Sequence, residues 1–129
     1  MVSLKTFFVT LSLSLLPATA PAEPATTHPM LDTFAGCAGR LSALMQHQWL
    51  FADPAARETE ARRADMVALL DAVMPVRVGR EVLSRRTAAR SAHTALLTRA
   101  AFNEDTADAA WARRRAEAEI QLCYDLVLR

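Results

Sequence analysis

The sequence contains two cysteines, Cys37 and Cys123, and they are its most direct candidates for covalent chemistry. Cys37 lies within residues 34–49, which read FAGCAGRLSALMQHQW. A lipid-modified cysteine directly follows an apolar signal segment, but about twenty residues separate Cys37 from the N-terminal apolar run. A nucleophilic cysteine needs a histidine as its base, and covalent haem needs C-x-x-C-H, which neither cysteine has. A disulfide between the two cysteines is therefore predicted, provided that the chain is exported.

One histidine, His93, stands among apolar residues at helical spacing, with Arg86 two turns earlier on the same side. Gln48 has a comparable central position on another apolar stripe. Buried polar groups need hydrogen-bond partners, so these three residues are predicted to form a buried polar cluster. In a second interpretation His93 binds a small molecule, a metal or a haem, with Met45 or Met66 opposite it. No other histidine or carboxylate lies three or four residues from His93, whereas zinc takes three or four protein ligands, so neither metal nor cofactor is predicted.

Sequence motifs for catalysis are absent. The chain has no glycine-rich phosphate loop, no nucleophile elbow, no H-E-x-x-H and no paired-acid signature. Scattered aspartates and glutamates occur in every soluble helix and do not define an active site. The protein is therefore expected not to be an enzyme.

Residues 1–20 read MVSLKTFFVTLSLSLLPATA and have the three parts of a secretory signal peptide. These parts are one lysine, a short apolar run, and a small-x-small pattern that ends at Ala20. The run falls well short of the roughly 20 residues that cross a membrane, so no stable membrane insertion is expected after cleavage. Cleavage after Ala20 is predicted, followed by a flexible proline-rich leader at residues 21–29 and a single domain at residues 30–129.

Four stretches of this domain have the three- and four-residue apolar spacing of amphipathic helices. They span about residues 30–51, residues 54–74, a segment that begins near residue 79, and a segment that follows the turn at residues 103–108. The predicted core residues are, helix by helix, Leu31, Phe34, Ala38, Leu41, Met45 and Trp49; Met66, Leu69, Leu70, Val73 and Met74; Val82, Ala89, Ala92, Leu96, Leu97 and Ala100; and Ala109, Ala112, Ala116, Ile120, Cys123 and Val127. His47 is expected on the outer face of the first helix. The pattern predicts an all-α fold, a four-helix up-down-up-down bundle.

Such a bundle brings the two cysteines together. Its first and last helices run antiparallel, with Cys37 near the start of one and Cys123 near the end of the other. At the rise of an α-helix, both lie about 10 Å from the same end of the bundle. A Cys37–Cys123 disulfide between the first and last helices would stabilise the folded chain by about 4–5 kcal/mol.

The charge of the chain gives no reason to expect nucleic-acid binding. Without Lys5 the sequence has fourteen arginines and fourteen acidic residues. Residues 76–102, however, contain six arginines and one acid, Glu81. This basic segment predicts either an acidic partner or, with more weight, a solvated surface paired with acids of the second and fourth helices. The abundance of alanine and arginine with no further lysine suggests GC-rich coding DNA, and with the signal segment it favours the periplasm of a Gram-negative bacterium, or secretion.

Two further features predict close contacts. Trp111, Ala118 and Leu122 form a second ridge on the fourth helix, which is either packed against another helix or used for a protein partner or self-association. Gly36 and Gly39 flank Cys37, and glycine inside a helix costs about 1 kcal/mol relative to alanine. They are placed off the main apolar stripe. A close approach by a neighbouring backbone, from this chain or a partner, is predicted there, and simple tolerance of glycine is the alternative.

These features together predict a small exported, non-enzymatic helical protein with an interaction or accessory role in the cell envelope. One alternative is a helical bundle that carries a small ligand, a haem or a metal around His93. Another is a periplasmic chaperone-like protein, which rests only on small size, helicity and the predicted disulfide. Optical absorption and elemental analysis would separate the first alternative from the others.

Overall fold

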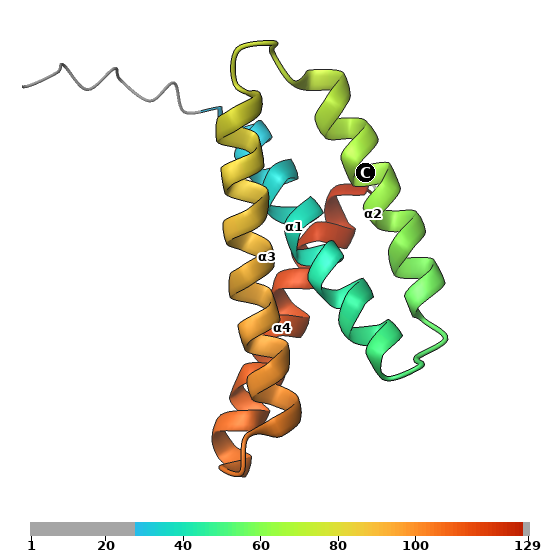
Figure 1. The fold of residues 1–129 in the computed structure, drawn as a ribbon, viewed down its shortest axis with the longest axis vertical. Helices are drawn as coiled ribbons and strands as arrows, with labels where there is room; N and C mark the ends of the chain where they lie inside the picture. Colours follow the sequence, from blue (N-terminus) through green and yellow to red (C-terminus); the bar gives the residue numbers. More distant parts are fainter. Residues whose placement is uncertain (1–27, 128–129) are drawn as a thin grey trace, which may run out of the picture.

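The computed structural model describes residues 28–127, which form four α-helices (Figure 1). They are α1 (Pro29–Leu50), α2 (Ala56–Val73), α3 (Gly79–Phe102) and α4 (Thr106–Val127). Consecutive helices alternate in direction, and no strand occurs in this part of the chain. The predicted four-helix up-down-up-down bundle is confirmed. The predicted signal peptide lies outside the described residues, and none of the four helices is long and apolar enough to span a membrane.

The helix ends follow from local sequence. Pro29 stands in the first turn of α1, where its missing N–H group would have no helical partner anyway. Pro75 follows the end of α2, because proline cannot continue a helix. Before α4, the side chain of Asp105 accepts hydrogen bonds from the backbone N–H groups of Ala107 and Asp108, at 3.0 and 3.1 Å. Such an N-terminal cap typically stabilises a helix by about 1 kcal/mol.

The central helix of the bundle is α1. It packs against α2 on one side and α3 on the other, and the backbones of α2 and α3 do not approach each other closely in the described residues. The α4 helix packs along α3 first and then crosses α1 to reach α2 (Figure 1). Because three helices meet α1, almost every residue from Ala35 to Ala43 is buried, and most of them are small. Small side chains let the neighbouring helices come close to the α1 backbone.

The apolar core has two parts. One surrounds the disulfide and contains Cys37, Ala38, Leu41, Met66, Ile120 and Cys123. The other lies at the start of α1 and contains Leu31, Ala35, Leu70 and Val82. The core predicted for α4 is confirmed from Ala109 to Cys123.

Several predicted core residues are instead exposed, namely Trp49, Leu69, Val73 and Ala92. The α2 helix meets its neighbours along a narrow stripe that contains Met66 and Leu70, and Leu69 and Val73 lie beside that stripe. Trp49 lies in the last turn of α1, beyond the part that three helices cover, and 54 % of its surface is exposed. The apolar periodicity of the sequence identified which side of these helices faces the core. It could not show how wide a stripe of that side the neighbouring helices cover.

Gly39 permits the close contact between α1 and α3. A Cβ atom at this position would overlap the carbonyl oxygen of Arg86 and lie 3.0 Å from the backbone nitrogen of Arg90. The predicted backbone approach is therefore confirmed at Gly39, and the neighbour is a helix of the same chain. Gly36 and Gly39 are both buried although they lie off the main apolar stripe, because neighbouring helices cover α1 on more than one side. At Gly36 a Cβ atom would meet only the end of the flexible Arg40 side chain, at 2.9 Å.

Candidate functional site

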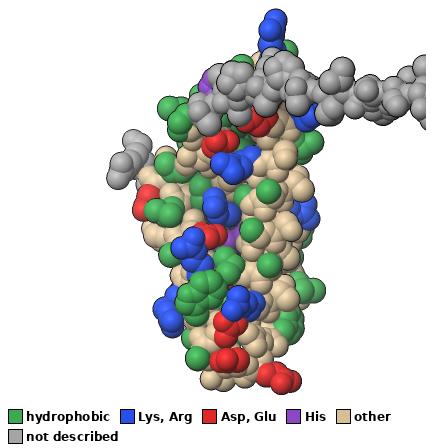
Figure 2. Space-filling view, turned by 90° about the vertical axis from the view of Figure 1, so that its left-hand side faces the viewer, with side chains coloured by type: hydrophobic (Ala, Val, Ile, Leu, Met, Phe, Trp, Pro, Cys, Tyr) green, Lys and Arg blue, Asp and Glu red, His purple; other side chains and the backbone are tan. Residues whose placement is uncertain are grey.

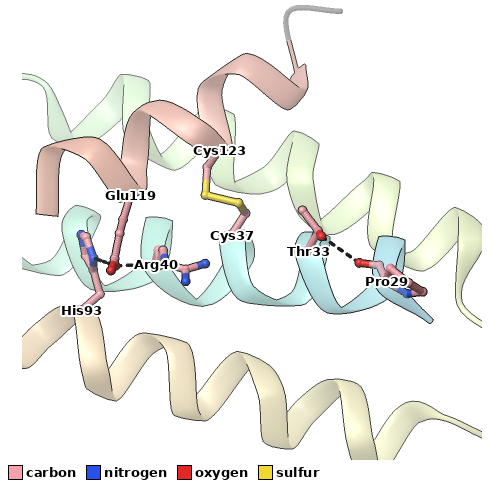
Figure 3. Close-up of a disulfide and its surroundings, with 7 residues drawn as sticks. All are labelled: Pro29, Thr33, Cys37, Arg40, His93, Glu119 and Cys123. Carbon is pink, nitrogen blue, oxygen red and sulfur yellow. Dashed lines mark hydrogen bonds and ion pairs between the residues drawn. A yellow bond between two sulfur atoms is a disulfide. The ribbon is translucent and has the colours of Figure 1, made fainter. Parts of the chain in front are cut away.

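The predicted Cys37–Cys123 disulfide joins α1 to α4 (Figure 3). The two Cα atoms are 5.4 Å apart, and both cysteines are buried. A disulfide sulfur has no thiolate form, so neither residue can act as a nucleophile or a metal ligand while the bond is intact. The cysteine chemistry of this protein is therefore structural, and the candidate site lies elsewhere.

A charged network lies next to the disulfide, around Glu119 of α4. One carboxylate oxygen, Oε2, accepts a hydrogen bond from Nε of Arg40 at 3.2 Å and lies 3.3 Å from Nδ1 of His93 (Figure 3). The other oxygen, Oε1, accepts a hydrogen bond from Nε of Arg115 at 2.9 Å. Partial burial acts to raise the pKa of Glu119, but the hydrogen bonds from His93 and the two arginines outweigh it and lower the pKa below its ordinary value. The carboxylate is therefore ionised at neutral pH.

The ionised carboxylate fixes the tautomer of His93. An ionised carboxylate only accepts hydrogen bonds, so Nδ1 of His93 carries the proton and donates it to Glu119. Burial lowers the pKa of His93, although the hydrogen bond and the charge of Glu119 act in the opposite direction. The imidazole is therefore neutral at pH 7, with its lone pair on Nε2.

Nε2 of His93 is a buried acceptor that no described residue satisfies. The exposed fraction of the whole side chain is 0 %. A buried polar group without a hydrogen-bond partner costs about 1–3 kcal/mol, and groups of this kind are uncommon in native proteins. Among the described residues, Nε2 of His93 and the side-chain oxygen of Gln48 are the two buried polar side-chain atoms without a hydrogen-bond partner.

His93 lines a cavity of about 430 Å³ between α1, α3 and α4. The other lining residues of α1 and α3 lie C-terminal to Arg40 and to His93, respectively. In α4, most of the lining residues lie N-terminal to Glu119. The cavity is therefore on the far side of the charged network from the disulfide. Because α4 has not yet crossed α1 at this level, the three helices leave a hollow between them that is partly open to solvent.

The walls of the cavity are mostly apolar. Leu44, Leu97, Ala116 and Ile120 are among the side chains that form them, together with a pair of stacked rings, His47 and Phe51, whose centroids are 4.7 Å apart. The expectation that His47 faces solvent is wrong. It is half-buried because α1, α3 and α4 converge around it.

The predicted polar cluster of Gln48, Arg86 and His93 is not formed. The hydrogen bonds described join none of the three to one another, and the side-chain oxygen of Gln48 is itself buried without a partner. The side chain that is hydrogen-bonded to His93 is instead that of Glu119, 26 residues further along the chain. Sequence reasoning missed it because helical periodicity relates residues within one helix, whereas this pair joins two helices. The available signal was a glutamate directly before the core residue Ile120, with Arg115 one turn earlier.

The structure does not support the methionine ligands considered for a haem. Met66 lies in the core around the disulfide, and neither Met45 nor Met66 lines the cavity. Among residues 28–127, no group of three histidine, cysteine, aspartate or glutamate side chains is placed to hold a metal ion.

The predicted ridge of Trp111, Ala118 and Leu122 is exposed on α4, and its contact with another helix is the one between Trp111 and Arg99 of α3. Trp111 is 48 % exposed and Leu122 68 % exposed. The guanidinium group of Arg99 lies 5.2 Å from the centroid of the Trp111 ring, in a cation–π contact. Figure 2 shows apolar side chains interspersed with arginines and acids on the side of the molecule where α3 and α4 run. A protein partner for this ridge stays a prediction.

Two of the six arginines of residues 76–102 pair with acids, one of α1 and one of α4. Arg85 lies 3.4 Å from Asp32 of α1, and Arg99 forms an ion pair with Asp108 of α4. The expected pairing with α4 is confirmed, and the expected pairing with α2 is wrong because α2 lies on the opposite side of α1.

The molecule is a disulfide-linked four-helix bundle with a buried histidine beside an apolar cavity. No family model, curated protein or solved structure matches this chain. The cavity and its histidine are therefore the basis for proposing a function.

Proposed function

We propose that this protein binds a small, mostly apolar molecule in the cavity between α1, α3 and α4, as a non-catalytic carrier of the cell envelope. The observation on which the proposal rests is the cavity itself, which has a volume of about 430 Å³ and is lined mostly by apolar side chains.

The size and the lining of the cavity support the binding of a small molecule. Binding sites for small molecules typically have volumes of roughly 300–1,000 Å³, and about 430 Å³ falls within this range. Such sites combine apolar walls with a few polar groups that orient the ligand. Here the walls come from leucine, isoleucine, alanine and phenylalanine, and the polar groups are two histidines, Arg113 and Glu117.

The same lining supports binding without catalysis. None of the residues described around the cavity is a serine, threonine, cysteine or tyrosine, so the site offers no hydroxyl or thiol nucleophile. The His93–Glu119 pair is an arrangement typical of an activated base, and the described residues that line the cavity offer it no side-chain nucleophile.

The proposed location is the periplasm or the exterior of a Gram-negative bacterium. The disulfide supports it, since such bonds persist in oxidising compartments and are rare in the cytosol. The signal-peptide pattern of residues 1–20 supports the same location.

A cavity-filling substitution tests the proposal. Ala116 is buried and lines the cavity, whereas Ala118 on the same helix is exposed. We expect Ala116→Leu to lower the affinity for 1-naphthol at least tenfold, measured by equilibrium dialysis, because the added side chain occupies the cavity. Ala118→Leu makes the same chemical change outside the cavity and should leave the affinity unchanged.

Circular dichroism spectra and thermal midpoints of both variants show whether they fold. If Ala116→Leu fails to fold, Ala100→Leu, which alters the same cavity from α3, takes its place. The proposal is wrong if the protein binds neither 1-naphthol nor its methyl ether, or if the cavity-filling variants bind as well as the wild type.

A further inference from the structure

We infer that the bundle has a separate binding site for a phosphate group, in a hollow where α2 and α3 face each other across α1 (Figure 1). This hollow has a volume of about 160 Å³ and is lined by three arginines, Arg63 of α2 and Arg86 and Arg90 of α3. It shares no lining residue with the cavity between α1, α3 and α4, so this inference does not depend on the proposed function.

The three arginine side chains converge on a short stretch of α1. Nε of Arg63 donates a hydrogen bond to Oγ of Ser42 at 2.7 Å. Nη2 of Arg90 donates one to Oε1 of Gln46 at 2.8 Å. The two acceptor residues are one helical turn apart on α1, about 6 Å along its axis, so the two guanidinium groups reach neighbouring points from opposite sides. Arg86 stands one turn before Arg90 on α3 and lines the same hollow.

The described residues bring no negative charge to this hollow. No acidic side chain lines it, and none of its three arginines forms an ion pair within residues 28–127. By contrast, Arg85 and Arg99 of the same α3 helix are each paired with an acid. Arg86 and Arg90 are moreover four residues apart, a spacing at which like charges destabilise a helix. An anion bound between the guanidinium groups would offset this repulsion.

A phosphate group fits these donors in access, size and number of oxygens. Arg63 and Arg86 are half-buried and Arg90 is exposed, so each side chain keeps surface that a ligand can contact. The hollow has about five times the volume of a water molecule in the liquid, which is enough for the five heavy atoms of phosphate. One guanidinium group can occupy both oxygens of a carboxylate, whereas a phosphate group has further oxygens for the other arginines.

Isothermal titration calorimetry with inorganic phosphate, at pH 7 and constant low ionic strength, tests the inference. Arg86→Gln is the main variant, because no described hydrogen bond or ion pair of the fold uses this side chain. A hydrogen bond to a charged group changes affinity by about 10- to 150-fold, and solvent screening lowers this factor at a partly open site. We therefore expect Arg86→Gln to lower the affinity about fivefold or more. Arg57→Gln removes an equal charge from an exposed position of α2 outside the hollow and should leave the affinity nearly unchanged.

The phosphate group could belong to a soluble compound or to a lipid headgroup, and vesicles of phosphatidylcholine with added phosphatidic acid distinguish the two. Sedimentation of the wild type and of Arg57→Gln with these vesicles, but not of Arg86→Gln, would identify a headgroup. A protein that binds inorganic phosphate and does not sediment with the vesicles would identify a soluble phosphate compound.

Absence of saturable phosphate binding by the wild type would overturn the inference. Equal affinity of the wild type and Arg86→Gln would also overturn it, as would equal losses in Arg86→Gln and Arg57→Gln, since net charge alone would then explain the binding. Tighter binding of acetate than of phosphate would show a carboxylate site instead. If circular dichroism shows that Arg86→Gln does not fold, Arg90→Gln takes its place with the same expected loss.

Discussion

Removal of the disulfide through Cys37→Ala and Cys123→Ala is expected to lower the free energy of unfolding by about 4–5 kcal/mol. The bond joins residues that are 86 positions apart, and cross-linking so long a loop strongly restricts the unfolded chain. It also ties the second half of α4 to α1 at the place where the two helices cross. The stability of small proteins is typically about 5–15 kcal/mol, so the loss would be a large part of the total.

Urea unfolding followed by circular dichroism measures this effect. Dithiothreitol should reduce the stability of the wild type by a similar amount, and it should leave the double variant unchanged, which controls for the loss of the sulfur atoms from the core. A loss below about 1 kcal/mol, the size of a single ordinary hydrogen bond, would mean that packing alone holds α4 on α1.

Substitution of Gly39 by alanine is expected to lower the free energy of unfolding by about 2 kcal/mol. Overpacking of a core costs about 1–3 kcal/mol, and at Gly39 the added carbon would press on backbone atoms of α3, which cannot rotate away. The better helix propensity of alanine offsets about 1 kcal/mol of a cost that should lie at the upper end of this range or above it.

Gly36→Ala is the matched control, because it makes the same change three residues earlier in the same buried stretch. Its Cβ atom would meet only the end of the Arg40 side chain, so we expect stability to stay equal or to rise by up to about 1 kcal/mol. Similar urea midpoints for the two variants would show that the close α1–α3 approach at Gly39 is not what selects glycine there.

The features of this fold that depend on the direction and period of single helices could be predicted from the sequence. The antiparallel order of the first and last helices was enough to pair Cys37 with Cys123. The 3.6-residue period was enough to place His93 in the interior and to identify the buried stripe of α4. Each of these inferences needs only one helix, or two helices whose relative direction the topology fixes.

The partner of His93 and the cavity could not be predicted in the same way. The pairing of His93 with Glu119 depends on how α4 is rotated against α3, and no periodic pattern within either helix reports that rotation. The exposure of Leu69 depends likewise on how narrowly α2 meets its neighbours. The cavity arises where three helices converge with small side chains such as Ala116 between them, so it is a property of the assembled bundle.

The most direct test of the binding site is a long-range ¹H–¹⁵N NMR spectrum of the His93 imidazole at pH 7, recorded with and without 1-naphthol. The account predicts a proton on Nδ1, none on Nε2, and a shift of the His93 ring resonances when 1-naphthol binds in the cavity that this residue lines. A ring protonated on Nε2, or ring resonances that do not move while 1-naphthol binds, would contradict it.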